Sequence, residues 1–538
     1  PITWPFALNF DRLKPSPPPR SQERLRPRPA SAIIETDMRL KQLIERLAVK
    51  KIEGPLDREI TGLAYDSRRV SPGMLFVAMA GQNVDGHDYI ASAIDRGAVA
   101  VICEHNDWVR QRATKIEVPN AREALAQTAL TFHDHPSARL KVIGVAGTHG
   151  KTTVSFLVKK MLEAIGIKTG LIGTIRYEIG ERMIPAQRTT PEALEIQQMM
   201  AQMLRAGCQA CVMEVSSHAL EQQRTCGVDF DVAIFTNLSR DHLEYHVNRE
   251  GYFQDKKKLG TPLPPGSKRA CTVINIDDEL GERFRRETQA EVKLTYGLGE
   301  SATIRASHIH LDKDGSRMEV QMPGAQFSCS LPLIGRHNIY NALAAIGAGA
   351  ALRLPPADMA AALHSMPPVP GRLERISTGR SFDVFVDYAH TDVALRNVLT
   401  TLREITTGRL LLAFGCGGSR ETGQRPKMGM VAAALADFTL ITSDNPRRES
   451  PASIAAQIEE GFGSVRNAGY QVELDRRQAI EKIIRLARPG DSVLIAGKGH
   501  ETYQEFEDTI VPFDDRVYAQ ESLETLGYAW QGLEWASR

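Results

Sequence analysis

The residues with the clearest chemical meaning form one glycine loop, Gly147-Thr-His-Gly-Lys-Thr-Thr153. An apolar run at 140–145 predicts a buried strand before the loop, and apolar residues at helical spacing follow it at 154–165. A glycine loop between a strand and a helix is typical of a phosphate-binding loop, because glycines let backbone N–H groups surround phosphate oxygens. Lys151 is expected to reach the terminal phosphates of a nucleotide, and Thr152 to bind Mg²⁺.

The loop departs from the strict phosphate-loop pattern at one position. That pattern has a glycine where this chain has Val145, and Gly147 is the nearest substitute. A glycine-rich turn without a ligand is the alternative interpretation. Lys-Thr at a helix start, after two glycines, has little structural purpose and favours phosphate binding.

Two more polar side chains follow strand-like segments in the same part of the chain. Glu214 comes directly after the apolar run 211–213, and His242 lies in the polar stretch after the run 232–235. At the ends of neighbouring strands, the two side chains are predicted to complete a metal site beside Thr152. The alternative is that each is solvated or caps a helix.

Three buried strands are predicted in the C-terminal third, at 410–414, 438–442 and 492–496. Each runs into a polar or glycine-rich loop, the second into Asp444-Asn-Pro-Arg447 and the third into Gly497-Lys-Gly-His-Glu501. In a parallel sheet these loops share the carboxyl edge, where α/β sheets bind ligands. A binding crevice is therefore predicted. Gly415-Cys-Gly417, after the first strand, lacks the third glycine of a dinucleotide-binding motif, which argues against a nicotinamide cofactor.

Length and composition limit the class of protein. The chain has 538 residues, 42% hydrophobic and 24% charged, which is ordinary for a soluble protein of two to four domains. The net charge of +1 and the lack of a concentrated basic face argue against nucleic acid, and no apolar run is long enough for a membrane span. Seven scattered cysteines indicate reduced thiols and a cytoplasmic location; Cys208 and Cys211 lack the second pair that a zinc site needs.

Composition and turn signals divide the chain into four parts. Residues 1–37 contain eight prolines and are predicted to be a disordered extension, or sequence ahead of a true start at Met38. Three α/β domains are then expected, at 38–138, 139–369 and 370–538, with a proline-rich linker at 367–371.

Together these segments resemble the Mur ligases, the cytoplasmic ATP-dependent enzymes that build the peptidoglycan stem peptide. The resemblance runs from Met38 to the C-terminal region. It is carried by six motifs: Gly147–Thr153, Glu214–His218, Asn237–His246, Gly335–Asn338, Pro370–Arg372 and Asp387–His390. It implies a small α/β UDP-binding domain, a central P-loop ATPase-like domain with a mostly parallel sheet, and a Rossmann-like C-terminal domain.

The resemblance also implies a reaction. Mur ligases of this kind use ATP to join an amino acid to the D-glutamate of UDP-N-acetylmuramoyl-L-alanyl-D-glutamate through an acyl phosphate. Within the family, Asp444-Asn-Pro-Arg447 is similar to the motif that recognises meso-diaminopimelate as the incoming amino acid. The implied cofactors are ATP, Mg²⁺ at two sites and a CO₂-derived carbamate on Lys256. No nucleic acid or membrane partner is expected, and a monomer is expected.

The family motifs assign these roles residue by residue. The implied catalytic residues are Lys151, carbamylated Lys256 and His242. The implied metal ligands are Thr152, Glu214, His242 and Lys256. The implied ATP-binding residues are Gly147, Thr148, His149, Gly150, Lys151, Thr152, Thr153 and Asn338. The implied contacts to the UDP part of the substrate are Tyr65, Ser67, Gln82, Asn83 and Val84, and those to its muramoyl-peptide part are Thr189, Thr190, Ser216, Gln222 and Arg224. The implied contacts to diaminopimelate are Arg420, Asp444, Asn445, Pro446, Arg447, Gly497 and Glu501.

Other functions share part of this pattern. A lysine-adding Mur ligase or a folylpolyglutamate synthetase would keep the phosphate loop, but Asp444-Asn-Pro-Arg447 argues against both. A kinase would release a phosphorylated substrate rather than an amide. A non-catalytic ATP-binding switch would not need the loops around Ser216, Lys256 and Glu501.

Overall fold

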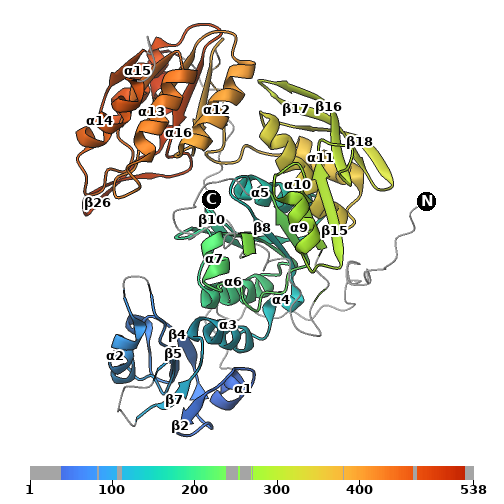
Figure 1. Ribbon diagram of the computed structural model, residues 1–538, viewed down its shortest axis with the longest axis vertical. Helices are drawn as coiled ribbons and strands as arrows, with labels where there is room; N and C mark the ends of the chain where they lie inside the picture. The colour runs from blue at the N-terminus through green and yellow to red at the C-terminus, as the bar shows by residue number, and fades with distance from the viewer. Residues whose placement is uncertain are drawn as a thin grey trace, which may run out of the picture.

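The computed structural model describes residues 38–81, 84–105, 112–237, 253–254, 268, 271–377, 379, 381–463 and 469–527. It contains three α/β bodies, each built on its own main sheet, as Figure 1 shows. Four residues with predicted roles lie outside the described ranges: Gln82, Asn83, His242 and Lys256. The extension at 1–37 lies outside them as well. In the described part of the chain, no helix is long and apolar enough to cross a membrane.

The N-terminal body is a five-stranded sheet in the order β2-β7-β6-β5-β4, parallel except for the pairing of β2 with β7. Helices and apolar side chains pack on both faces. Its strands are β2 (Lys51–Glu53), β4 (Gly62–Ala64), β5 (Met74–Val77), β6 (Ala100–Cys103) and β7 (Thr114–Glu117), with a separate pair β1 (Met38–Arg39) and β3 (Glu59–Ile60). Its helices are α1 (Leu40–Ile44), η2 (Ser67–Arg69), η3 (Gly86–Tyr89), α2 (Ile90–Asp95) and α3 (Ala121–Phe132).

The central body has an eleven-stranded sheet whose middle part is parallel. The parallel strands are β9 (Thr169–Ile172), β12 (Ala210–Val215), β8 (Lys141–Ala146), β13 (Val232–Phe235), β14 (Cys271–Asn275) and β15 (Val292–Gly297), in that spatial order. Antiparallel strands extend both ends: β10 (Arg176–Ile179) and β11 (Arg182–Pro185) beside β9, and β17 (Gly315–Met322) and β18 (Ala325–Leu331) beyond β16 (Ile304–Asp312).

Two layers of helices cover the central sheet. One face carries α5 (Lys151–Ala164), α10 (Arg336–Ala351) and α11 (Pro356–His364), whose apolar side chains form one core with the strands. The other face carries α6 (Ala193–Arg205), α7 (Ser217–Glu221) and α9 (Gly281–Glu287), and α4 (Pro136–Arg139) leads into β8. Because both faces are covered, β8 and β12 are almost wholly buried, which explains their continuous apolar sequences.

The C-terminal body is a doubly wound sheet in the order β19-β20-β24-β21-β22-β23, parallel except at β19. Its strands are β19 (Glu374–Ile376), β20 (Asp383–Asp387), β21 (Leu410–Phe414), β22 (Phe438–Ile441), β23 (Tyr470–Val472) and β24 (Ser492–Ala496), with a hairpin of β25 (Tyr503–Phe506) and β26 (Thr509–Pro512). Helices α12 (Asp392–Ile405), α13 (Gln424–Leu435) and α14 (Pro451–Phe462) cover one face, and α15 (Arg476–Leu486) and α16 (Asp515–Thr525) the other. The observed architecture confirms the predicted fold class.

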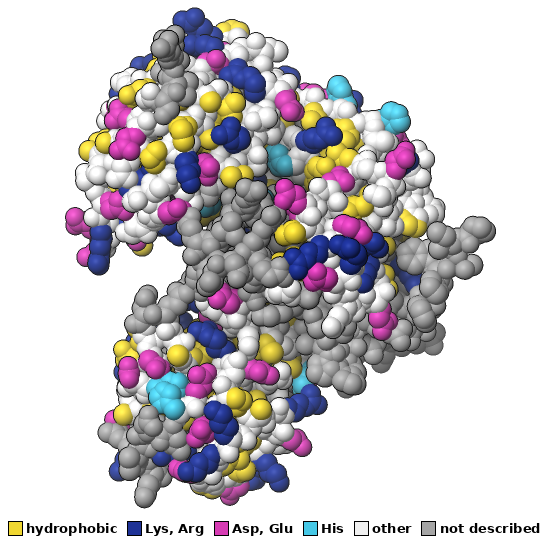
Figure 2. Space-filling view, viewed as in Figure 1, with side chains coloured by type: hydrophobic (Ala, Val, Ile, Leu, Met, Phe, Trp, Pro, Cys, Tyr) yellow, Lys and Arg dark blue, Asp and Glu magenta, His cyan; other side chains and the backbone are white. Residues whose placement is uncertain are grey.

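The strand order in the C-terminal body positions a ligand crevice. The last parallel strand, β24, inserts between β20 and β21, so the loops that follow β21, β22 and β24 gather at one carboxyl edge. Such a reversal of strand order is where α/β sheets bind ligands. In Figure 2 the molecular surface is hollowed between the N-terminal and C-terminal bodies.

Candidate active site

The phosphate loop depends on two glycines with positive φ. Gly147 has φ 148°, and a Cβ there would lie 1.8 Å from Thr236 Oγ1. Gly150 has φ 84°, and a Cβ there would lie 2.4 Å from Asn341 Oδ1. Glycine is therefore required at both positions, for its backbone freedom and for the close approach of neighbouring side chains.

Residues after β13 hold this loop in place. Thr148 N–H donates to Asn237 O at 3.0 Å, and His149 N–H donates to Asn237 Oδ1 at 2.9 Å. The His149 carbonyl accepts from Thr236 Oγ1 at 2.6 Å and from Asn237 Nδ2 at 3.1 Å. These bonds fix the backbone just before α5, whose first turn contains Lys151 and whose N-terminus carries partial positive charge.

Lys151 folds back over the loop that precedes it. Its Nζ donates to Gly147 O and to Thr148 O, both at 2.9 Å. Burial lowers the pKa of Lys151, whereas the carboxylate of Glu214 acts in the opposite direction. The ammonium therefore lies over the loop that is predicted to bind phosphate.

A buried carboxylate lies beside the first hydroxyl of α5. Glu214, at the end of β12, is 0% exposed, and its Oε2 accepts from Thr152 Oγ1 at 2.9 Å. Thr174 holds the same carboxylate through its hydroxyl at 2.8 Å and its backbone N–H at 2.8 Å. Carboxylate and hydroxyl oxygens are hard ligands that suit Mg²⁺, so the donor set fits the ion expected here. The sequence predicted this juxtaposition from the positions of the two strands.

The same hydrogen-bond network continues into a pocket of about 390 Å³. The Glu214 carbonyl accepts from Thr190 Oγ1 at 2.8 Å, and Ser216 N–H donates to that hydroxyl at 3.0 Å. Thr174 Oγ1 lies 3.1 Å from Thr189 Oγ1. The pocket is lined by Arg188, Thr189, Thr190, Ser216, His218, Gln222 and Arg224. All five residues predicted to hold the muramoyl-peptide part therefore meet, directly beside the phosphate loop.

Asn338 is less accessible than its predicted role suggests. It is 4% exposed in the first turn of α10, and its Nδ2 donates to Ile334 O at 2.8 Å. Its Oδ1 accepts from Asn341 Nδ2 at 2.9 Å, and Asn341 Oδ1 approaches Gly150. In the structure, Asn338 thus supports the phosphate loop through Asn341.

The segment between the central and C-terminal bodies reaches the phosphate site. Arg372 Nη2 donates to Thr152 Oγ1 at 3.3 Å, and the guanidinium lies 4.9 Å from the ring centroid of Tyr388. The Tyr388 ring is 4.8 Å from the ring of His500, in the loop after β24. Arg372 had no predicted role, although Pro370-Gly-Arg372 was recognised as a family motif, because only the tertiary structure places it on Thr152.

The three loops predicted to form a crevice do meet at the edge of the C-terminal sheet. Gly415 and Gly418 permit this, because Cβ atoms there would lie 2.1 Å from Thr442 O and 1.8 Å from Pro446 O. Asp444 is 8% exposed, and its Oδ2 is buried without a hydrogen-bond donor, although its Oδ1 accepts from Asn445 N–H at 2.7 Å. Gly497 lies against that oxygen, since a Cβ there would be 2.6 Å from Asp444 Oδ2. A buried carboxylate oxygen without a donor is suited to a ligand ammonium.

Arg447 follows on the same loop in a left-handed backbone conformation, with φ 53°. Its Nε donates to Glu505 Oε2 at 2.8 Å, and its Nη1 donates to Gly418 O at 2.8 Å. Two of its five N–H groups are thereby used, which leaves Nη2 and one Nη1 hydrogen to bind a carboxylate. Arg420, predicted to support this site, is exposed.

The residues predicted to bind UDP lie on the first body, next to the central one. Ser67 begins η2 and is buried, Val84 is 56% exposed, and Tyr65 Oη donates to Glu195 Oε1 of α6 at 2.8 Å. Burial, followed by the charge of Glu195, raises the pKa of Tyr65, so the phenol stays protonated and remains a donor. This bond connects the predicted uridine side to the helix that follows Thr189 and Thr190.

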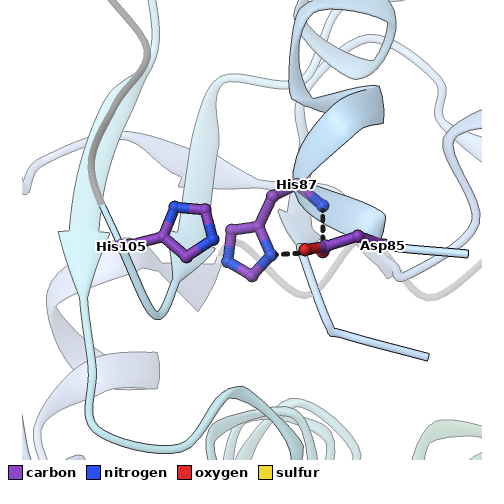
Figure 3. Close-up of side chains that lie close together, drawn as sticks. All are labelled: Asp85, His87 and His105. Carbon is purple, nitrogen blue, oxygen red and sulfur yellow. Dashed lines mark hydrogen bonds and ion pairs between the residues drawn. The ribbon is translucent and has the colours of Figure 1, made fainter. Parts of the chain in front are cut away.

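Two histidines, His87 and His105, pack together beside the loop that contains Val84. Figure 3 shows Asp85 and His87, with the ring of His105 stacked on that of His87 at 3.9 Å between centroids. His87 Nδ1 lies 2.6 Å from Asp85 Oδ1, and His87 Nε2 accepts from Glu104 N–H at 3.1 Å. A nitrogen that accepts carries no proton, so the proton is on Nδ1 and both ring nitrogens are used. The cluster has three residues of metal-binding types, but these bonds leave no lone pair of His87 for a metal ion.

Replacing His87 with alanine is expected to weaken binding of the UDP substrate about tenfold, because the bonds that hold Asp85 against β6 are lost. The Michaelis constant for ATP should stay unchanged. His105→Ala leaves both hydrogen bonds of His87 in place and should have a smaller effect. Direct titration with UDP substrate checks this, and equal losses in the two variants would contradict the bracing role.

Known proteins resemble this chain over most of its length. Three family models match in order: "Mur ligase family, catalytic domain" at 59–133, "Mur ligase middle domain" at 145–349 and "Mur ligase, glutamate ligase domain" at 371–499. Two curated relatives are named UDP-N-acetylmuramoyl-L-alanyl-D-glutamate–2,6-diaminopimelate ligase. The protein from Syntrophomonas wolfei is 43% identical over 90% of this chain and 99% of its own, and that from Solibacter usitatus is 44% identical over 90% and 98%.

A solved structure of a protein with the same name is also similar. It superposes with a TM-score of 0.67 at 30% identity and covers 92% of this chain and 100% of its own. The agreement therefore extends over all three bodies and over nearly the full length of the relatives. On this basis, the chain belongs to the Mur ligase family.

Proposed function

We propose that this chain is an ATP-dependent ligase that adds meso-diaminopimelate to the D-glutamate of UDP-N-acetylmuramoyl-L-alanyl-D-glutamate. The observation that carries the proposal is the hydrogen-bond path from Thr152 through Glu214 to Thr190, because it joins a phosphate loop to a polar pocket of substrate size. The names of the curated relatives support the choice of substrates. In this proposal the domain at 38–138 binds UDP, the domain at 139–369 binds ATP and the domain at 370–538 binds the amino acid.

A carboxylate does not react with an amine at neutral pH, so the glutamate must first be activated. An oxygen of the γ-carboxylate attacks the γ-phosphorus of ATP, and ADP leaves, which produces an acyl phosphate. This step brings two anions together, and Lys151 and the N-terminus of α5 offset their repulsion. Thr189, Thr190 and Ser216 are suited to hold the peptide beside the phosphate.

The amine of diaminopimelate then attacks the acyl carbon. The resulting tetrahedral centre expels phosphate as its C–O bond breaks, and the nitrogen loses a proton to leave an amide. The amino acid must therefore reach the acyl phosphate from the C-terminal body. The path from Thr152 to Arg372, Tyr388 and His500 connects the phosphate loop to the loop after β24.

Thr152 and Glu214 are the described residues that would hold Mg²⁺, which when bound supplies further neutralisation of phosphate charge. His242, predicted to complete this site with Glu214, lies outside the described residues, and so does Lys256, whose carbamate is proposed to bind a second Mg²⁺. Phe253 and Gln254 are the described neighbours of Lys256, and Phe253 is fully buried against Phe284. The lysine run 256–258 therefore begins three residues after a side chain that is packed in the core.

The proposal is tested by phosphate release with ATP, the UDP substrate and one amino acid at a time. We expect ADP, phosphate and a new amide with meso-diaminopimelate, and little product with L-lysine. A kinase would instead yield a stable phosphorylated substrate without amide. Product from L-lysine as fast as from meso-diaminopimelate would contradict the choice of amino acid.

Lys256→Ala is expected to lose most of the ligase activity, because the carbamate that would bind a metal ion cannot form. Acetate or a similar small carboxylate should restore part of it by replacing the missing anionic oxygens. Lys257→Ala and Lys258→Ala are the matched controls and should be mild. Equal losses for all three lysines, without rescue, would indicate that the run acts only as a charged surface.

A further inference from the structure

A lysine outside the predicted set is fully buried among residues predicted to bind the incoming amino acid. Lys498 lies between Gly497 and Gly499 in the loop after β24, and it is 0% exposed. Its Nζ donates to Asn445 Oδ1 at 3.0 Å and to Glu501 Oε2 at 3.1 Å, and it lies 5.4 Å from the ring centroid of Tyr503. Burial of an ammonium is costly unless it is paired, so this position has a specific requirement for the cation and its partners.

The partners of Lys498 are two residues predicted to bind the incoming amino acid. Asn445 Oδ1 also accepts from Glu505 N–H at 3.1 Å, which directs its amide nitrogen to Glu501 Oε2 at 2.9 Å. Lys498 and Asn445 thus donate to the same oxygen of Glu501. Among the described residues, no donor is recorded for Glu501 Oε1, and this oxygen is available to a ligand ammonium.

Lys498 also balances the charge of the pocket. Apart from the exposed Glu421 and the ion pairs Arg425–Glu449 and Arg448–Asp508, the charged side chains of these loops and of β25 are three carboxylates and three cations: Asp444, Glu501 and Glu505, and Arg420, Arg447 and Lys498. The far end of meso-diaminopimelate carries an ammonium and a carboxylate and is neutral overall, whereas the far end of L-lysine carries an ammonium alone. A balanced pocket suits the first, and a pocket that has lost one cation suits the second.

We propose that Lys498 is a positioning and specificity-determining residue: it orients Glu501 and Asn445 and keeps the pocket charge-balanced, which favours meso-diaminopimelate over L-lysine. This inference rests on the proposed function, because it assumes that the pocket binds the amino acid. It assigns Lys498 no contact with the reacting atoms.

The test compares Lys498→Met, which keeps the length of the side chain and removes its charge, with the unmodified enzyme. The Michaelis constant for meso-diaminopimelate should rise about tenfold, because two charge-assisted hydrogen bonds are lost. Those for ATP and the UDP substrate should not change. The ratio of kcat/KM for meso-diaminopimelate to kcat/KM for L-lysine should fall by about tenfold or more, because an unbalanced carboxylate remains.

Two further variants complete the design. Lys482→Met is the matched control and should leave all constants unchanged, because the Lys482 side chain on α15 is about half exposed and pairs with Glu473. Lys498→Gln is neutral but can still donate hydrogen bonds, so it provides the same selectivity measurement if the methionine variant does not fold.

The outcomes separate the two ideas. If the unmodified enzyme fails to add meso-diaminopimelate, the proposed function is wrong. If it adds it, but both Lys498 variants keep the original selectivity, the inference about Lys498 is overturned. A lower melting temperature with equal changes in all three Michaelis constants would likewise overturn it, since that result indicates a role in stability alone.

Discussion

Lys151→Ala is expected to abolish acyl phosphate formation, with a loss of about 10²- to 10³-fold in kcat. In the structure the ammonium is already held over the loop by Gly147 O and Thr148 O, so little rearrangement is needed to meet a phosphate. No other described lysine lies on this loop to replace it. Positional isotope exchange in ATP, which reports acyl phosphate formation directly, measures the effect.

Lys160→Ala is the matched control for that experiment, because Lys160 lies on the same helix nine residues beyond Lys151. Its activity should be close to that of the unmodified enzyme. Binding of the UDP substrate should survive in both variants, since Tyr65, Ser67 and Val84 lie on a different body. Undiminished ligation by Lys151→Ala would remove the basis for ATP activation at this loop.

Arg447→Ala is expected to lower kcat/KM for meso-diaminopimelate by about 10- to 100-fold, the value of a charge-assisted hydrogen bond or a bidentate pair. The carboxylate that distinguishes this amino acid from L-lysine needs a cation at the far end of the pocket. Nη2 and one hydrogen of Nη1 are available to this carboxylate, because Glu505 accepts from Nε and Gly418 O accepts from the other Nη1 hydrogen. Steady-state kinetics with each substrate varied in turn measures the change.

Arg448→Ala is the control for charge alone. The Arg448 side chain is 80% exposed and its ion pair with Asp508 is 3.4 Å long, so its removal should have little effect. For Arg447→Lys, kcat/KM for meso-diaminopimelate should lie between the values for Arg447→Ala and Arg448→Ala, because lysine keeps the charge but lacks the planar guanidinium. An unchanged Michaelis constant for meso-diaminopimelate in Arg447→Ala would exclude Arg447 from recognition of that carboxylate.

Local sequence patterns predicted the elements that position the site. The strands expected at 232–235, 410–414 and 492–496 have those bounds in the structure, because each is a buried apolar run with a polar loop after it. Glu214 was predicted to lie beside Thr152 because both follow strand-like runs in the same domain. In the structure, β12 and β8 are neighbouring parallel strands, and Glu214 is in register with Val145 near the end of β8.

Side chains whose roles depend on long-range packing could not be predicted. Lys498 and Asn445 are 53 residues apart, and Arg372 and Thr152 are 220 apart. Nothing in the local sequence distinguishes Lys498 from an exposed lysine in a glycine loop. The strands β17 and β18 likewise extend the central sheet beyond β16 through antiparallel pairing, which the alternating strand and helix pattern does not indicate.

The contact of Arg372 with Thr152 gives the nucleotide site and the C-terminal body one side chain in common. If Thr152 binds Mg²⁺ as proposed, its hydroxyl would turn away from this guanidinium, and we then expect nucleotide binding and the position of Arg372 to depend on each other. Thermodynamic linkage makes such dependence reciprocal: any factor by which ATP alters amino-acid affinity through Arg372 is the factor by which the amino acid alters ATP affinity. The two binding steps therefore share one coupling constant, which calorimetric titrations in either order should return with the same value.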